Sequence, residues 1–181
     1  MHESSLVIEP ISPPERVPFR TLYERHFAFS WRALRYIGVP QALLDDAAQE
    51  LWVVVHRRYA EFEGRSDVKT WLFAIAINVE RNIRRVEGRR ARLVPLPAEL
   101  SASDGDPLVA SEEKEAWGLV LSFLATLDET RRAVFAACLV EGLSAAETAA
   151  ITELPIETVY NRVRALKRSF ATWVEQQRSE P

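Results

Sequence analysis

The segment that most constrains the fold is residues 62–92, FEGRSDVKTWLFAIAINVERNIRRVEGRRAR. Its apolar residues recur at helical spacing and form one stripe, Trp71, Leu72, Ile75, Ala76, Val79, Ile83 and Val86. The opposite face and the far end carry the arginines Arg81, Arg84, Arg85, Arg89, Arg90 and Arg92. The segment therefore predicts a polar loop followed by a long helix, with a buried stripe and an outer surface that suits phosphates.

The rest of the chain has helical periodicity and no convincing alternation with period two. Two helices are expected before this segment, over 19–37 and 44–59, the first closed by Gly38 and Pro40. After it, residues 93–110 contain prolines, a glycine and acidic residues that break a helix. Four further helices are expected at roughly 111–126, 128–140, 144–151 and 155–177.

The segment Gly142–Leu166, GLSAAETAAITELPIETVYNRVRAL, is typical of a helix-turn-helix. Ser144 and Glu147 form a predicted capping box, and Pro155 suits the start of the second helix. Larger apolar residues and a glycine are more usual where Thr148, Thr152 and Glu153 stand, which weakens the match. In the second helix an inward stripe of Ile156, Val159, Val163 and Leu166 leaves a polar face outside. A helical hairpin with a solvated basic face is the alternative interpretation.

We therefore predict an all-α protein with two small helical domains joined by a flexible linker, the second domain carrying the helix-turn-helix. The expected boundaries are a disordered leader at 1–15, a helical domain at 16–92, a linker at 93–112 and a second helical domain at 113–178.

Composition excludes several classes of protein. The chain of 181 residues has a formal charge of −3, so basic charge is local rather than general. A single cysteine, Cys138, permits no internal disulfide, which fits a cytoplasmic protein. With three scattered histidines, no metal site, cofactor or catalytic residue is expected, and no P-loop or nucleophile–base pair is evident, so we do not expect an enzyme. No apolar run is long enough to predict membrane insertion.

Three segments, in this order and spacing, resemble the extracytoplasmic-function (ECF) sigma factors of bacterial RNA polymerase. They are DDAAQELWVVVHRR, FEGRSDVKTWLFAIAINVERN and LDETRRAVFAACLVEGLSAAETAAITELPIETVYNRVRALKR. The resemblance covers roughly residues 19–92 and 115–175. It implies that the chain joins core RNA polymerase, binds the −35 promoter element as duplex and captures the −10 element as it melts. It also makes an anti-sigma factor an expected partner.

Two sets of residues are candidates for contacting promoter DNA. A melted strand needs phosphate contacts and a pocket for an extruded base. The loop and the helix after it offer a −10 set of Glu63, Gly64, Arg65, Ser66, Asp67, Lys69, Asn78, Arg81, Asn82 and Arg85. By its register, Trp71 is expected to pack in the core instead. The outer face of the last helix offers a −35 set of Thr158, Tyr160, Asn161, Arg162, Arg164, Lys167 and Arg168.

The resemblance also implies a set of residues that bind polymerase: Asp45, Asp46, Gln49, Glu50 and Trp52. Without the resemblance, the acidic members would be read as a solvated helix face. Three other functions stay open. The runner-up is a helix-turn-helix DNA-binding regulator that acts without core polymerase, which would leave residues 62–92 without a role. An all-α enzyme acting on nucleic acid and a protein-binding adaptor are the others.

Overall fold

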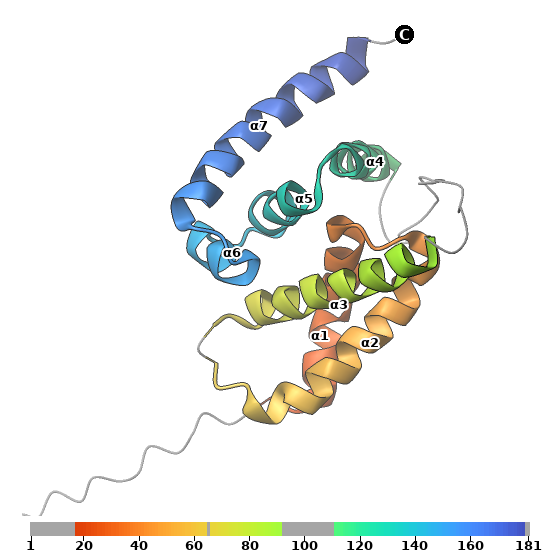
Figure 1. The fold of residues 1–181 in the computed structure, drawn as a ribbon, viewed down its shortest axis with the longest axis vertical. Coiled ribbons are helices and arrows are strands. Elements are labelled where there is room, and N and C mark those ends of the chain that lie inside the picture. The colour runs from red at the N-terminus through yellow and green to blue at the C-terminus, as the bar shows by residue number, and fades with distance from the viewer. Residues whose placement is uncertain (1–16, 65, 92–110, 180–181) are drawn as a thin grey trace, which may run out of the picture.

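The computed structural model describes residues 17–64, 66–91 and 111–179. Within these ranges the chain forms helices and no strand, as predicted (Figure 1). The predicted leader, most of the predicted linker and Arg65 lie outside the described residues. The helices are α1 (Phe19–Ile37), α2 (Leu44–Arg58), α3 (Val68–Ala91), α4 (Ser111–Thr126), α5 (Glu129–Phe135), α6 (Ala145–Thr152) and α7 (Ile156–Ser179), with short 3-10 turns at Gln41–Leu43 and Tyr59–Glu61 and a π-helical turn at Ala136–Val140.

Helices α1, α2 and α3 pack on one another through a shared apolar core. Helix α1 ends at Gly38, whose φ of 108° lies in the left-handed region that favours glycine. Each helix contributes side chains from which water is excluded, for example Leu34 from α1, Leu51 from α2 and Leu72 from α3. The apolar stripe of α3 is buried as predicted from Leu72 to Val79, but Val86 is 38% exposed. The buried part of the stripe is therefore shorter than the periodicity suggested.

The second group of helices begins with α4 and ends with the long helix α7. Asp128 caps α5 by accepting a hydrogen bond from the Arg131 N–H. The π-helical turn then leads to α6 and carries Cys138, whose half-buried Sγ lies 3.0 Å from the Thr148 hydroxyl. Burial raises the pKa of the Cys138 thiol, so this cysteine is held as a neutral core residue.

The two groups of helices contact each other. Helix α3 packs against α6, and α1 packs against α5 (Figure 1). Tyr36 of α1 also stacks on Trp117 of α4, with ring centroids 5.6 Å apart. The described residues therefore form two helical groups with a direct seam between them.

Candidate nucleic-acid and polymerase interfaces

Helix α6 has the local structure that the sequence predicted. The Ser144 hydroxyl accepts from the Glu147 N–H at 3.2 Å, and the Glu147 carboxylate accepts from the Ser144 N–H at 2.9 Å, which completes the capping box. Thr148 and Thr152 are both buried. The Thr152 hydroxyl donates to the Thr148 carbonyl at 2.6 Å. The two threonines are therefore accommodated in the core because their hydroxyl groups find partners.

The turn between α6 and α7 is unusual at Glu153. This residue has a φ of 58°, and it is the one non-glycine residue with a positive φ among those described. A left-handed conformation costs a side-chain-bearing residue roughly 1–2 kcal/mol. The turn is nevertheless closed in the usual way, since the Leu154 N–H donates to the Ala149 carbonyl at 3.2 Å. Glu153 thus has a strained backbone conformation that a glycine would adopt without strain.

Helix α7 is held by a buried stripe that begins at Val159, which is 0% exposed, and continues through Leu166. The prediction that Ile156 faces inward is wrong, because this first-turn side chain is 40% exposed and the buried stripe starts later. Of the predicted −35 set, the structure places on the exposed face Tyr160, Asn161, Arg164, Lys167 and Arg168, whereas Thr158 and Arg162 are half-buried.

A helix that enters a major groove needs a buried face that fixes its position and an outer face of polar side chains. The exposed side chains of α7 include one amide, one phenol and several cations, which together can contact base edges and phosphates. One guanidinium nitrogen of Arg162 is buried and has no hydrogen-bond partner among the described residues. Arg162 is therefore less accessible than its place in the predicted set requires.

The predicted −10 set follows the loop before α3 and then α3 itself. Gly64 has a φ of 70°, and the Asp67 carboxylate accepts from the Lys69 N–H at 2.8 Å, which fixes the start of the helix. The loop residues Glu63, Gly64, Ser66 and Asp67 are exposed, and so are Lys69 and Asn78 on the helix. Trp71 is half-buried and stacks on Phe62, with centroids 4.6 Å apart, in line with its predicted packing role.

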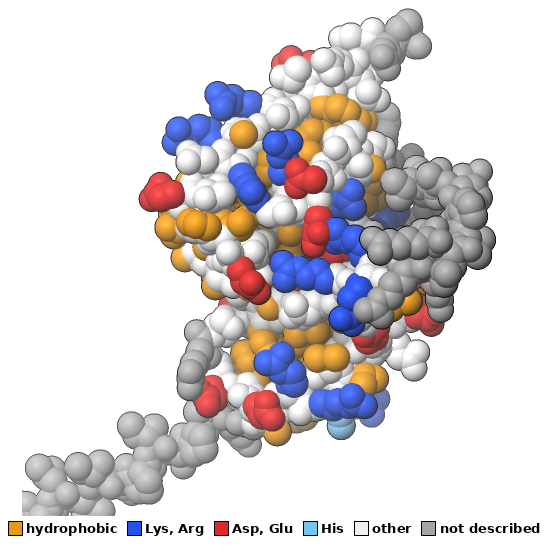
Figure 2. Space-filling model, viewed as in Figure 1, with side chains coloured by type: hydrophobic (Ala, Val, Ile, Leu, Met, Phe, Trp, Pro, Cys, Tyr) orange, Lys and Arg blue, Asp and Glu red, His pale blue; other side chains and the backbone are white. Residues whose placement is uncertain are grey.

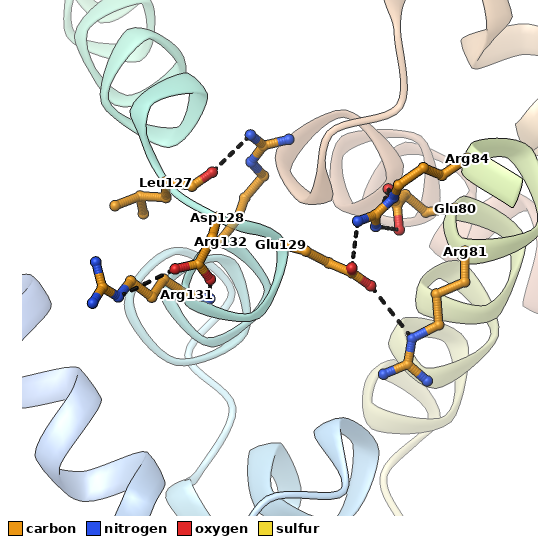
Figure 3. Close-up of polar contacts among 8 residues, drawn as sticks. All are labelled: Glu80, Arg81, Arg84, Leu127, Asp128, Glu129, Arg131 and Arg132. Atoms are coloured by element: carbon orange, nitrogen blue, oxygen red, sulfur yellow. Dashed lines mark hydrogen bonds and ion pairs between the residues drawn. The ribbon is translucent and has the colours of Figure 1, made fainter. Parts of the chain in front are cut away.

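Further along α3, three of the predicted residues already have protein partners. The Asn82 side-chain amide donates to the Glu50 carboxylate at 3.2 Å, and Arg85 donates to the side-chain Oδ1 of Asn82 at 2.9 Å. Arg81 lies 3.6 Å from the Glu129 carboxylate of α5 (Figure 3). The structure thus links the −10 set to the predicted polymerase-binding residue Glu50 and to the second group of helices.

Arg84, which was not in the predicted −10 set, is the centre of a charged cluster on α3. It contacts Glu80, one turn earlier, and Glu129 across the seam (Figure 3). Burial alone would lower the pKa of Arg84, but the hydrogen bonds to Glu80 and Glu129 outweigh it and raise the pKa. The Glu80–Arg84 pair could be predicted from its i,i+4 spacing. The contact of Arg84 with Glu129 on α5 could not, because no pattern in the sequence indicates it.

The predicted polymerase-binding set lies along α2. Asp45, Asp46, Gln49 and Glu50 are exposed, whereas Trp52 is only 5% exposed. Trp52 lines an open hollow of about 520 Å³, and its indole N–H has no partner among the described residues. Apolar side chains that sequence reasoning did not place at a surface also line this hollow, namely Phe19, Tyr23, Phe27 and Val53.

This hollow has the character of a protein-docking surface. Tyr23, Phe27 and Val53 are 39%, 37% and 43% exposed, which is unusual for a contiguous group of apolar side chains.

Among the residues that the structure describes, no group of three potential metal ligands occurs. In the same ranges, no helix is long and apolar enough to cross a membrane.

Comparison with known proteins identifies the family. The model described as Sigma-70 region 2 matches residues 22–90, and that described as Sigma-70, region 4 matches residues 118–169. The ECF RNA polymerase sigma-E factor of Escherichia coli K12 is 31% identical over 136 residues, which cover 69% of this chain and 70% of that protein. This chain belongs to the ECF sigma factors.

One further sequence relative and two solved structures are also similar to this sigma factor. The RNA polymerase sigma factor CnrH of Cupriavidus metallidurans is 28% identical over 155 residues, 80% of each chain. Among solved structures, RpoE from Bartonella quintana in complex with the anti-sigma factor NepR has a TM-score of 0.75 at 18% identity, covering 87% of this chain and 96% of that one. CnrH in complex with the cytosolic domain of CnrY has a TM-score of 0.61 at 25% identity, covering 87% and 88%.

The family models coincide with the two groups of helices in this sigma factor. The region 2 match runs from α1 to the end of α3, and the region 4 match runs from α4 into α7. The loop and basic helix therefore belong to region 2, and the helix-turn-helix belongs to region 4.

Proposed function

We propose that this sigma factor joins core RNA polymerase through α2, binds the −35 element with α7 and captures the melted −10 element with α3 and the loop before it. Its role is to select the promoter and help open it, with no catalytic activity of its own. Core polymerase works in the cytoplasm, so the same location is proposed here. The observation that carries the proposal is the presence on one chain of two separately anchored polar surfaces, one on α3 and one on α7.

On the −35 element, Tyr160, Asn161 and Arg164 would contact bases. These side chains are exposed on the side of α7 opposite the buried Val159 and Leu166. An amide and a guanidinium can each make two hydrogen bonds to a base edge. Lys167 and Arg168 lie one to two turns further on and would bind phosphate, whereas the half-buried Thr158 and Arg162 would have to become more accessible to do so.

On the −10 element, the loop of residues 63–67 and Asn78 would hold an extruded base. Lys69 and Asn78 are nine residues apart, which is about 13 Å along the helix at its usual rise. At about 100° per residue they project from opposite sides of α3, so Lys69 would act with the loop, whereas Arg81 and Arg85, three and seven residues after Asn78, share its face. Asn78 supplies both a donor and an acceptor to the edge of a base, and Lys69, Arg81 and Arg85 supply charge for the backbone.

For polymerase, the hollow beside α2 would be the docking surface. Its exposed apolar side chains would be covered, and the unpartnered Trp52 indole N–H would find an acceptor, when a partner helix fills it. Asp45, Asp46, Gln49 and Glu50 would form the polar rim. We also propose an anti-sigma factor as a partner, since RpoE is seen in complex with the anti-sigma factor NepR and CnrH in complex with the cytosolic domain of CnrY.

Run-off transcription with purified core polymerase tests this proposal. The template promoters are first selected from a random DNA library with the holoenzyme. We expect transcripts only when both chain and core are present, and only weak binding of duplex DNA by the chain alone, because its net charge is negative. A Val53→Glu change on the hollow should reduce core binding, whereas Glu175→Gln on α7 should not. Tight, sequence-specific binding by the chain alone, with no transcription, would favour the regulator alternative.

A further inference from the structure

Two consecutive hydrogen bonds connect α2 to the polar face of α3. The Glu50 carboxylate accepts from the side-chain amide of Asn82 at 3.2 Å, and the Oδ1 of Asn82 accepts from the guanidinium of Arg85 at 2.9 Å. Glu50 and Asn82 meet because α2 packs on α3 (Figure 1). We call Glu50, Asn82 and Arg85 the amide bridge. Roles are proposed above for Glu50 and Arg85, whereas Asn82 has none.

The amide bridge fixes the orientation of the Asn82 side chain. An amide has one end that donates hydrogen bonds and one end that accepts them. Glu50 accepts from the donating end, so the accepting oxygen is turned toward Arg85. With the amide rotated by half a turn, its oxygen would face the carboxylate and its nitrogen would face the guanidinium, and both contacts would be repulsive. Glu50 therefore ensures that Asn82 offers an acceptor to Arg85.

The surroundings of Asn82 do not suit a direct contact with DNA. Asn82 is half-buried and lines a hollow of about 190 Å³ between α2 and α3. The carboxylates of Asp46, Glu50 and Glu87 line the same hollow, and they would repel a phosphate brought to the amide. Arg85, in contrast, is exposed and lies outside the lining of this hollow. The contact with DNA therefore belongs to Arg85, and Asn82 stands behind it.

Arg85 gains from being held in place. A long exposed side chain loses rotamer freedom when it binds a ligand, and restraining it beforehand lowers that cost. The bond to Asn82 uses one of the five N–H donors of a guanidinium, so a phosphate can bind without breaking it. Figure 2 shows Lys and Arg side chains interspersed with Asp and Glu side chains on one face of the molecule. With cations scattered in this way, capture of a strand depends on where each one points.

We propose that Asn82 is a positioning residue, which is oriented by Glu50 and holds the guanidinium of Arg85 ready for a backbone phosphate of the melted strand. Asn82 itself contacts neither base nor phosphate. The inference rests on the proposed role of α3 in capturing the melted −10 element. It adds that a carboxylate of α2 supports this capture through the amide bridge, besides its place on the polymerase rim.

The test uses purified holoenzyme and a fluorescein-labelled promoter template mismatched across the −10 region, with binding followed by fluorescence anisotropy. Asn82→Ala should weaken binding roughly two- to tenfold, as expected for the loss of one hydrogen bond. In an Arg85→Ala background the same change should have almost no further effect, because no guanidinium is left to position. Glu50→Ala should cause a smaller loss that also vanishes in that background. The matched control is Gln176→Ala, which removes an exposed amide from α7 and should bind like wild type.

Base preference and salt separate positioning from direct contact. Asn82→Ala should weaken binding to every single-base variant of the −10 element alike and leave the salt slope unchanged, since Arg85 keeps its charge. Wild-type affinity for Asn82→Ala, or a loss that persists in full in the Arg85→Ala background, would overturn the positioning role. A change in base preference of about fivefold or more would also overturn it, by showing a direct base contact. In each of these cases, run-off transcription by the wild-type holoenzyme would leave the proposed function standing. Failure of wild type to support transcription would remove the proposed function and the inference together.

Discussion

Replacing Gly38 by alanine is expected to weaken both α1 and the seam. Gly38 closes α1 with a φ of 108°, and a Cβ built on it would lie 2.0 Å from Nη1 of Arg132 on α5. Arg132 cannot move away freely, because it donates to the Leu124 and Leu127 carbonyls, each at 2.9 Å. The new methyl group would therefore break contacts on two helices.

The cost can be divided into two parts. The left-handed backbone costs an alanine roughly 1–2 kcal/mol. Displacing Arg132 forfeits at least one hydrogen bond from a charged donor, worth about 1.5–3 kcal/mol when buried and less here, where the side chain is half-buried. The free energy of unfolding should therefore fall by about 2–4 kcal/mol.

Urea unfolding followed by tryptophan fluorescence measures this cost. Gly142→Ala is the matched control, since Gly142 also has a positive φ but a Cβ there would meet nothing within 4 Å. With a urea slope of about 2 kcal/mol/M, the midpoint for Gly38→Ala should lie roughly 0.5–1 M below that of the control. In an Arg132→Ala background the extra loss should largely disappear. Equal midpoints for the two glycine variants would refute the close approach of Arg132 to Gly38.

Three further predictions follow from the site. Asn161→Ala or Arg164→Ala should change base preference at the −35 element by about 1–3 kcal/mol for a direct contact, measured as relative holoenzyme affinity for single-base promoter variants; an unchanged preference would refute the assignment. Lys167→Ala should weaken binding to all sequences alike and reduce the salt slope by about one unit. Hydrogen bonds from Thr70 and Ser144 lower the pKa of Glu147 from 4.5, so its contribution to stability is present above pH 4.5 and is lost as the pH falls through the lower folded value. Glu147→Gln, which keeps a capping-box residue, should flatten that acid dependence in urea titrations.

The helices could be predicted closely from the sequence because each has local signals. The capping box at Ser144 and Glu147, the glycine at 38 and the apolar periodicity mark where helices begin and end. The apolar periodicity alone, however, does not predict which side chains are buried near helix ends. Ile156 and Val86 fit the periodicity but are exposed, since exposure depends on where neighbouring helices stop.

The candidate site was predictable only in part. The exposed faces of α3 and α7 follow from the spacing of their apolar residues. The contacts of Arg81 and Arg84 with Glu129 do not, because residues 45 or more positions apart leave no periodic pattern. The apolar hollow beside α2 was missed for a similar reason. Tyr23 and Val53 sit on different helices, and only their packing shows that they share a surface.

Permanganate footprinting of a promoter selected with the holoenzyme is the most direct test of the central claim, which is that the loop before α3 and Asn78 hold the melted strand. Wild type should make thymines of the −10 region reactive. Asn78→Ala, or a Gly/Ser replacement of residues 63–67, should bind core polymerase normally but open this promoter poorly. Both variants should regain most activity on a template already mismatched across the −10 region, because the cost of melting has been removed. Normal opening by the variants, or an equal loss on matched and mismatched templates, would contradict the account.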